Sequence, residues 1–411
     1  MRAPLCSIDP AEILTRHVIE DPHPFFARVR ERHPISRVGE TGVHLVVTWQ
    51  GILEALDREE DFSANLTGVL MRDAAGQPSI FELPPSDGTR VIATADEPRH
   101  AVHRQSVKPR LTEARIDAME PAIRRLVQGA LAAWLGNGGG DFVPVAEIVP
   151  ARVIGQLLGL PEGDAERHRN WAMVGGEMLA GDVDLGRMQT LARENAGMAE
   201  YLGRHLQDAG EFPSLPAEAS LLHSLAQATQ EGALSRSEAT GIAIVMFGAG
   251  GESTSALLGS AMRLLASDAV LATQLREDPE LIPRFVEEVV RLEPPFKFHY
   301  RAVRRACEFG GVTLEPGDRL MLLWVAANRD PAVFEAPDEM RLDRKHPKYH
   351  LSFGRGAHFC VGEQLARLEA RIMVEEVLAA TRKIGPDPDH PPVHAHSIFT
   401  RRLEALPIVI D

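Results

Sequence analysis

The residue in this sequence best placed for covalent or metal chemistry is Cys360. It lies in a glycine-rich segment, residues 353–362, directly before residues 363–377, whose apolar side chains recur at helical spacing. The amino end of a helix carries partial positive charge and free backbone N–H groups, which favour a thiolate over a thiol. A thiolate there can act as a nucleophile or ligate a metal. For a cysteine without further context, the alternative is a small buried apolar side chain.

The other two cysteines, Cys6 and Cys307, do not extend this pattern. An odd number of cysteines at wide spacing fits neither a disulfide framework nor a Cys-x-x-Cys zinc site. Any special cysteine chemistry therefore belongs to a single thiol.

A second group of reactive side chains interrupts a long apolar segment. A helix is predicted from Ser235, where Ser-x-x-Glu238 forms a capping box, to about Ala266. Its centre, residues 248–255, holds three glycines, a carboxylate and three hydroxyls, and each glycine costs roughly 1 kcal/mol relative to alanine. The residues favour two interpretations about equally. In the structural one, the glycines allow close packing against a neighbour or join two helices at Gly250. In the functional one, the segment is a groove with groups that can relay protons.

The elements that position these groups are predicted to be mostly helices. Apolar residues recur every three to four positions over 116–134 and 188–206, and short β-branched or apolar runs predict strands over 43–48, 311–314 and 320–325. Two long irregular segments, residues 64–94 and 329–355, are rich in Gly, Pro and Asp, and loops of that length are often functional. The sequence thus predicts a mainly helical fold with a small β-rich portion.

Charge and composition exclude several classes of function. The 411 residues carry a net charge of −14, and the whole excess of acid lies in residues 1–300, since residues 301–411 hold 16 basic and 16 acidic side chains. Such a chain is a poor prospect for nucleic acid or an anionic membrane. The longest uninterrupted apolar run is eight residues, Leu320–Ala327, and residues 1–10 resemble neither a secretory signal nor a transit peptide. We therefore expect a cytoplasmic protein that does not span a membrane.

The cysteine segment resembles the haem-binding motif of the cytochrome P450 family, soluble bacterial type. Every fixed position of Phe-Gly-x-Gly-x-His-x-Cys-x-Gly is present at residues 353–362. The resemblance extends, in the family's order, from about residue 20 to the end of the chain. Its further elements are residues 96–104, residues 249–254, Glu288-x-x-Arg291, and residues 326–331 with Phe334 and Pro337.

This resemblance implies a single cytochrome P450 domain over residues 1–411, with residues 1–20 as a possible loose amino-terminal arm, and haem b, iron protoporphyrin IX, as cofactor. Cys360 is then the iron ligand. The resemblance assigns the haem propionates to His100, Arg104, Arg301 and His358, and further haem contacts to Ala249, Phe353, Gly354 and Gly362. It makes Glu288 and Arg291 a structural lock beneath the haem. The implied activity is insertion of one oxygen atom of dioxygen into an organic substrate, hydroxylation above all.

The catalytic residues implied by the resemblance are Glu252, Ser253 and Thr254, which would deliver protons to bound dioxygen. The sequence departs from the family here, because Ser253 stands where threonine is usual. Serine keeps the hydroxyl but lacks the methyl group that restrains its rotamer, so more leakage of peroxide is expected. Whether Ser253 or Thr254 leads is left open.

The resemblance also assigns walls of a substrate pocket by position. They are Leu70, Phe81, Val245, Phe296, Phe298, His299 and Phe399, with Ile80, Leu83, Ala249 and Ile398 beside them. Most are apolar, which predicts a small apolar organic substrate. A lone aromatic side chain is more often core packing than a ligand contact, and His299 could be an ordinary buried histidine.

The expected partners follow from local charge. Residues 341–358 hold five basic residues and one acid, a local charge of +4 directly before the cysteine. The residues favour two interpretations of this segment about equally: an ordinary solvated loop, or a docking site for a small acidic iron–sulfur protein. On the second, we expect a ferredoxin and its reductase as electron donors to a monomeric enzyme. Two alternatives stay open at this point: a peroxide-using haem-thiolate enzyme, and a non-catalytic haem-binding sensor or carrier.

Overall fold

The computed structural model describes residues 7–73, 75–83, 90–211 and 220–411, and within them helices predominate. This confirms the predicted fold class. The α-helices are α1 Pro10–Ile13, α2 Arg16–Glu20, α3 Pro22–Arg32, α4 Trp49–Asp57, α5 Arg99–Val107, α6 Glu113–Gly136, α7 Val143–Leu158, α8 Ala165–Ala172, α9 Val174–Met178, α10 Leu185–Glu211, α11 Leu221–Gln230, α12 Arg236–Ser267, α13 Ala269–Glu277, α14 Ile282–Leu292, α15 Trp324–Ala327 and α16 Glu363–Ala380.

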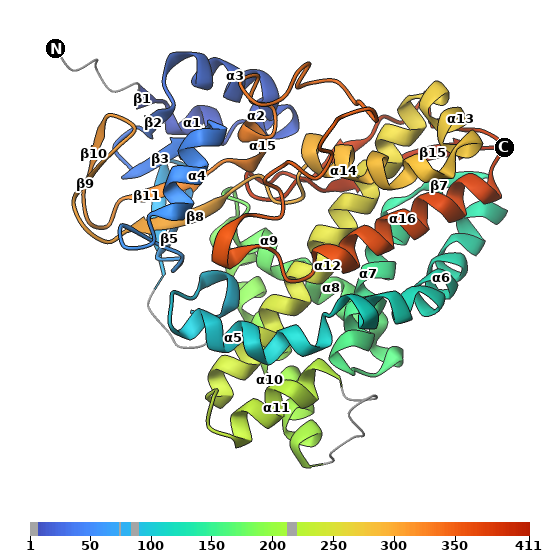
Figure 1. Ribbon diagram of the computed structural model, residues 1–411, viewed down its shortest axis with the longest axis horizontal. Coiled ribbons are helices and arrows are strands. Elements are labelled where there is room, and N and C mark those ends of the chain that lie inside the picture. The colour runs from blue at the N-terminus through green and yellow to red at the C-terminus, as the bar shows by residue number, and fades with distance from the viewer. Residues whose placement is uncertain (1–6, 74, 84–89, 212–219) are drawn as a thin grey trace.

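The main sheet has six strands in the order β1 (Ser7–Ile8), β2 (Ile35–Val38), β3 (Val43–Val46), β11 (Arg319–Leu322), β8 (His299–Val303) and β4 (Phe62–Ser63). The β1–β2 and β3–β11 pairs are parallel, and the others are antiparallel. The smaller sheets are β5 (Gly68–Arg72) with β6 (Pro78–Glu82), β9 (Cys307–Phe309) with β10 (Val312–Leu314), β13 (Val393–His394) with β14 (Leu403–Ala405), and β12 (Ile384–Pro386) with β15 (Pro407–Ile410) and β7 (Gly139–Asp141). Most of the long helices gather on one side of the molecule, and the strands β2, β3, β8 and β11 lie on the other side with α1 to α4, whereas β7 and β15 lie beside α16 (Figure 1).

Helix α12 is the central element on which the site is built. The Ser235 hydroxyl accepts from the Glu238 N–H, and the Glu238 carboxylate accepts from the Ser235 N–H, so the predicted capping box is confirmed. The helix runs unbroken to Ser267, so the alternative of two helices joined at Gly250 is wrong. The glycines permit close packing, because a Cβ at Gly251 would meet the side chain of Ala172 on α8.

The other predicted elements are found with shifted ends. The helices predicted over 116–134, 188–206 and 363–377 correspond to α6, α10 and α16. Strand β3 ends at Val46, because Thr48 caps α4 by accepting from the Gly51 N–H. Strand β11 ends at Leu322, and Trp324 begins the short helix α15, so the strand predicted to Val325 is too long.

Buried apolar side chains form one large cluster among the helices and two smaller ones against the sheets. Residues 7–20 belong to the segment expected as a possible loose arm, yet they form β1, α1 and α2. Ile13, Leu14, Val18 and Ile19 are buried in one of the sheet clusters. Residues 1–6 lie outside the described part.

Among the described residues, α12 alone is long and apolar enough to cross a membrane by length and composition. However, 67% of its most apolar 18-residue window is buried inside the protein, as is usual for a core helix. The sequence scan did not single it out, because its glycines and hydroxyls interrupt the apolar run.

Candidate active site

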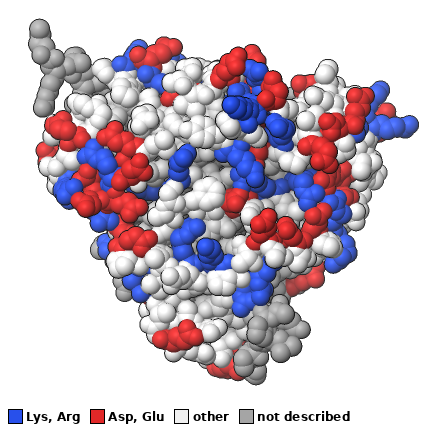
Figure 2. Space-filling view, in the orientation of Figure 1, with Lys and Arg blue, Asp and Glu red and all other residues white. Residues whose placement is uncertain are grey.

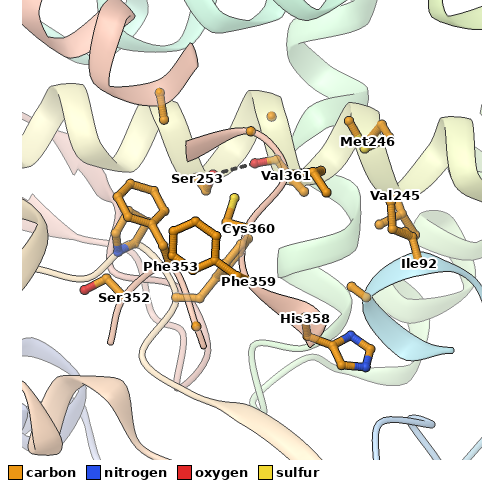
Figure 3. A pocket seen from close by; sticks show the side chains of 18 of the residues that line it. Ile92, Val245, Met246, Ser253, Ser352, Phe353, His358, Phe359, Cys360 and Val361 are labelled. Carbon is orange, nitrogen blue, oxygen red and sulfur yellow. Dashed lines mark hydrogen bonds between the residues drawn. The ribbon is translucent and has the colours of Figure 1, made fainter. Parts of the chain in front are cut away.

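A deep cavity lies between the middle of α12 and the segment that carries Cys360 (Figure 3). It encloses about 1470 Å³ of space free of protein atoms, part of it continuous with solvent. The walls come from α5, α7, α12, β8, α15 and α16 and from the loop before α16.

The loop 353–362 holds Cys360 in a fixed position at the start of α16. The Cys360 N–H donates to the Phe353 carbonyl over 2.8 Å, and Gly354 and Gly356 adopt φ angles of +69° and +70°, which favour glycine. The sulfur points toward α12, on which Ser253 lies opposite (Figure 3). Burial raises the pKa of the thiol, while the Gly362 N–H lowers it in part.

Four side chains from three parts of the chain meet at one side of this cavity. His100 and Arg104 come from α5, Arg301 from β8 and His358 from the cysteine loop. The imidazoles of His100 and His358 stack with centroids 4.0 Å apart, and Arg104 donates to the Phe359 carbonyl over 2.7 Å. Arg301 is buried, and among the described residues it donates only to the Tyr300 carbonyl; its burial lowers its pKa to about 10.

This set of groups fits iron protoporphyrin IX. The thiol suits the iron, and buried guanidinium and imidazole groups suit two propionates, which need charged or N–H donors once out of water. The buried Nδ1 of His358 has no hydrogen-bond partner among the described residues, as a group awaiting such an anion would be. Phe353, Gly354 and Gly362 line the same cavity, as does Ala249 on α12.

Helix α12 presents a stripe of small and apolar residues to the cavity: Val245, Met246, Ala249, Gly250, Ser253, Thr254 and Leu257. The Ser253 hydroxyl donates to the Ala249 carbonyl one turn earlier (Figure 3). Such back-bonding is common for a hydroxyl inside a helix, and it leaves the lone pairs of the Ser253 oxygen available on the cavity side.

Glu252 does not line the cavity. Each residue turns a helix by about 100°, so Glu252 projects to one side of the stripe, toward Gly176 on α9 and Arg402. Its Oε1 lies 3.8 Å from Arg402 Nε, and the carboxyl is 2% exposed. Burial raises the pKa of Glu252 to about 8, although Arg402, the Thr400 hydroxyl and the Gly176 N–H oppose the shift.

Four of the expected pocket walls, Val245, Ala249, Phe296 and His299, line the cavity. Phe298, directly before strand β8, does not line it. Side chains alternate in extended backbone, so His299 and Arg301 face the cavity, while Phe298 and Tyr300 face the other side and pack edge to face at 5.0 Å.

The remaining expected walls do not line this cavity. Leu70 is fully buried in β5, where its N–H donates to the Tyr300 hydroxyl, and Phe81 on β6 is 48% exposed. Phe399 stacks behind Phe296 with centroids 4.8 Å apart, so it supports the wall without forming it. Ile398 is buried nearby, and Ile80 and Leu83 pack against the same sheet cluster.

Several cavity residues were missed by the sequence reasoning. Ile154 and Leu157 of α7 face the site, but their apolar helical spacing only indicated a core. Glu369 of α16 lines the cavity and its buried Oε2 has no hydrogen-bond partner among the described residues, and burial raises its pKa well above the ordinary range. Its signal was present: Glu369 follows Leu368 within the apolar side of a predicted helix. Trp324 gave no comparable signal.

Some basic side chains of the segment before the cysteine are already paired with acidic residues, so fewer are available to a partner than the segment's charge suggested. Arg344 donates to Glu288 over 2.9 Å, and Arg341 pairs with Asp343 over 3.1 Å. Lys345, Lys348 and Arg355 remain exposed. On the face that carries α16, basic and acidic side chains are intermixed (Figure 2).

Comparison with known proteins supports the same assignment along the whole chain. The family described as Cytochrome P450 matches residues 206–393. Cytochrome P450 144 of Mycobacterium tuberculosis (strain ATCC 25618 / H37Rv) is 39% identical over 96% of this chain and 90% of its own length. The steroid C26-monooxygenase of Mycolicibacterium smegmatis is 29% identical over 93% and 90%.

A solved structure agrees with these relatives. CYP109E1 from Bacillus megaterium, crystallised with testosterone, superposes with a TM-score of 0.85 at 26% identity, over 96% of this chain and 99% of that one. The chain therefore belongs to the cytochrome P450 family and is a haem-thiolate monooxygenase.

Proposed function

We propose that this enzyme inserts one atom of dioxygen into an apolar organic molecule, most often as a hydroxyl group. The observation that carries the proposal is the cavity itself. It has the thiol of Cys360 on one side, the guanidinium groups of Arg104 and Arg301 at its edge, and the apolar stripe of α12 with Ser253 and Thr254 opposite. When bound, the haem supplies oxygen activation, which a thiolate ligand favours by donating electron density.

We propose that Cys360 ligates the iron. His100, Arg104, Arg301 and His358 would hold the propionates, because these groups converge on one edge of the cavity from α5, β8 and the cysteine loop. Phe353, Gly354, Gly362 and Ala249 would lie against the faces of the ring. The chain would act as a single domain, because α5 and α16, which lie far apart in the sequence, both line the same cavity.

Proton delivery is assigned to Glu252 with Ser253 or Thr254. A pKa of about 8 keeps Glu252 protonated at neutral pH, so it can give a proton. Its carboxyl lies beside the cavity wall, so the proton reaches the cavity by rotation of the side chain or through water. Ser253 is the better placed hydroxyl, because its hydrogen is bound to Ala249 and its oxygen can accept the next hydrogen bond.

The substrate would be apolar, because Ile154, Leu157, Val245, Leu257 and Phe296 form most of the wall above Cys360. Two similar proteins are named for steroids, one as a steroid C26-monooxygenase and one solved with testosterone. A compact multi-ring skeleton is therefore the first class to test.

Electrons would come from a ferredoxin and its reductase. The docking surface we propose is the exposed rim around Cys360, with Lys345, Lys348 and Arg355 as its basic groups and Phe359, 39% exposed, as its apolar group. A monomeric cytoplasmic enzyme remains our prediction.

The test is a reconstituted reaction with ferredoxin, ferredoxin reductase and NADPH. A steroid panel is first screened for a shift of the ferric Soret band, and the compounds that bind are incubated under ¹⁸O-labelled dioxygen. The proposal expects one labelled oxygen atom in the product. Product formed only when peroxide replaces the electron donors would favour a peroxide-using enzyme, and binding without oxygen consumption would favour a sensor or carrier.

A further inference from the structure

We infer that His299 presents a fixed N–H donor to the substrate, so that the natural substrate carries a hydrogen-bond acceptor on its apolar skeleton. The inference deepens the proposed function and rests on it. The indole Nε1 of Trp324 lies 2.8 Å from Nδ1 of His299. An indole N–H can only donate, so Nδ1 must accept, and the single proton of the neutral imidazole is on Nε2.

The backbone and the packing both hold this imidazole in place. His299 pairs with Leu322 in the β8–β11 register, and Trp324 follows two residues later in the buried helix α15. The rings of Phe296 and Phe399 contact the imidazole edge to face, with centroids 5.5 and 5.8 Å away. The donor therefore has a set direction before any ligand binds.

The other nitrogen of His299 is open to the cavity. Among the described residues Nε2 has no hydrogen-bond partner. Protein atoms do not bury this nitrogen completely, and the ring lines the cavity. Burial and the charge of Arg301 lower the pKa of His299 to about 3, so the ring is neutral at physiological pH. A neutral donor suits a carbonyl, hydroxyl or ether oxygen.

The surroundings make this donor selective. Phe296 and Val245 line the cavity with it and offer no acceptor, and the Ser253 hydroxyl hydrogen is already bound to Ala249. A ligand without an acceptor would bury the Nε2–H unpaired, which is unfavourable. The donor thus favours binding of oxygenated skeletons over plain hydrocarbons. It also sets the orientation of the bound skeleton, because the end that carries the acceptor must lie at His299.

The first experiment uses N-phenylimidazole probes that carry either an acetyl or an isopropyl group at the ortho, meta or para position. Imidazole coordination to ferric iron gives a spectral titration without knowledge of the substrate. We expect the wild type to prefer the acetyl over the isopropyl probe by about tenfold for at least one isomer, as a recovered hydrogen bond of ordinary strength predicts. His299→Leu should lose that preference. The control Ile154→Val, at a cavity residue that makes none of the contacts holding His299, should keep it.

A second readout does not depend on affinity or on iron ligation. In protein labelled with ¹⁵N-histidine, in the diamagnetic ferrous carbon monoxide form, the His299 signal, assigned with His299→Leu, should show the proton on Nε2. Trp324→Phe should release this tautomer. A proton on Nδ1 would overturn the inference. It would also be overturned if, for every isomer, the acetyl-over-isopropyl preference of His299→Leu matched that of the wild type within about twofold. Loss of haem from His299→Leu with the preference unchanged would overturn it as well, since His299 would then serve the haem. Failure of the proposed function would appear separately, as a missing thiolate spectrum in the wild type.

Discussion

At Glu252 a single buried carboxyl links stability to pH. Its pKa is raised to about 8 against an ordinary value of 4.5, so between these pH values the unfolded chain releases a proton that the folded protein keeps. Folding stability attributable to this group therefore falls as pH rises from about 4.5 to about 8. The groups that face it are Arg402, Thr400, Gly176 and, more distantly, Glu177.

We predict that Glu252→Gln removes this pH dependence. The free energy of unfolding of the variant should exceed that of wild type by an amount that grows between pH 5 and pH 8, to on the order of 5 kcal/mol. Urea denaturation of both proteins across this range measures the difference, in which the other titrations cancel. A difference that stays constant with pH would mean that the Glu252 carboxyl titrates normally.

Ser253 and Thr254 differ in a way that predicts which hydroxyl matters. Both hydroxyl residues line the cavity, but Ser253 is half-buried and tied to the Ala249 carbonyl, whereas Thr254 is only 3% exposed. Ser253→Ala should raise peroxide release per NADPH consumed several-fold, since a positioned proton relay contributes about 10²–10⁴-fold to proton transfer. Thr254→Val is the matched control and should change the ratio little. The reverse order would make Thr254 the leading hydroxyl.

Between elements, the contact of α9 with α12 depends on one glycine. A Cβ at Gly176 would collide with the Glu252 carboxylate, whereas a Cβ at Gly175 would meet no atom within 4 Å. We predict that Gly176→Ala destabilises the protein by about 1–3 kcal/mol, as overpacking does, and that Gly175→Ala is neutral or stabilising. In a Glu252→Ala background the cost of Gly176→Ala should largely vanish. Equal costs in both backgrounds would place the strain elsewhere.

The Glu288–Arg291 pair joins α14 to the segment before the cysteine loop. Both side chains are 0% exposed and bond through two contacts of 2.7 and 2.8 Å, and Arg291 also donates to the carbonyls of Asn328, Pro337 and Glu339. Arg291→Met should cost about 3–5 kcal/mol, because Glu288 is left buried beside fewer cations.

The control for this change is Arg341→Met in the same segment, whose pair with Asp343 is partly exposed and worth roughly 1 kcal/mol or less. Thermal unfolding and haem retention compare the two variants. Equal effects would show that the buried pair is not the lock between these elements.

Across the whole molecule, the sequence predicted most where local pattern and motif coincide. Apolar spacing and the capping box at Ser235 located α12, and the motif at residues 353–362 located the cysteine loop. Side-chain direction was harder to predict. Glu252 and Ser253 are neighbours in the motif, yet a 100° step sends them to different sides of α12, and the side-chain alternation that leads into β8 turns Phe298 away from the cavity.

Contacts between distant segments could not be predicted at all. Trp324 and His299 are 25 residues apart, and Arg402 and Glu252 are 150 apart, and neither pair leaves a periodic pattern in the sequence. The same holds for Arg344, whose pairing with Glu288 removes charge from the predicted basic segment. Such contacts are set by tertiary packing.

The central claim is that Cys360 holds haem iron as a thiolate, and one spectrum tests it most directly. The purified protein is reduced and exposed to carbon monoxide, beside Cys360→Ala and the control Cys307→Ala, whose cysteine lies in β9 away from the cavity. We expect the strongly red-shifted Soret band of a thiolate ligand in wild type and Cys307→Ala, and its loss in Cys360→Ala. A wild-type protein that binds haem without that band, or a Cys360→Ala variant that retains it, would contradict the account.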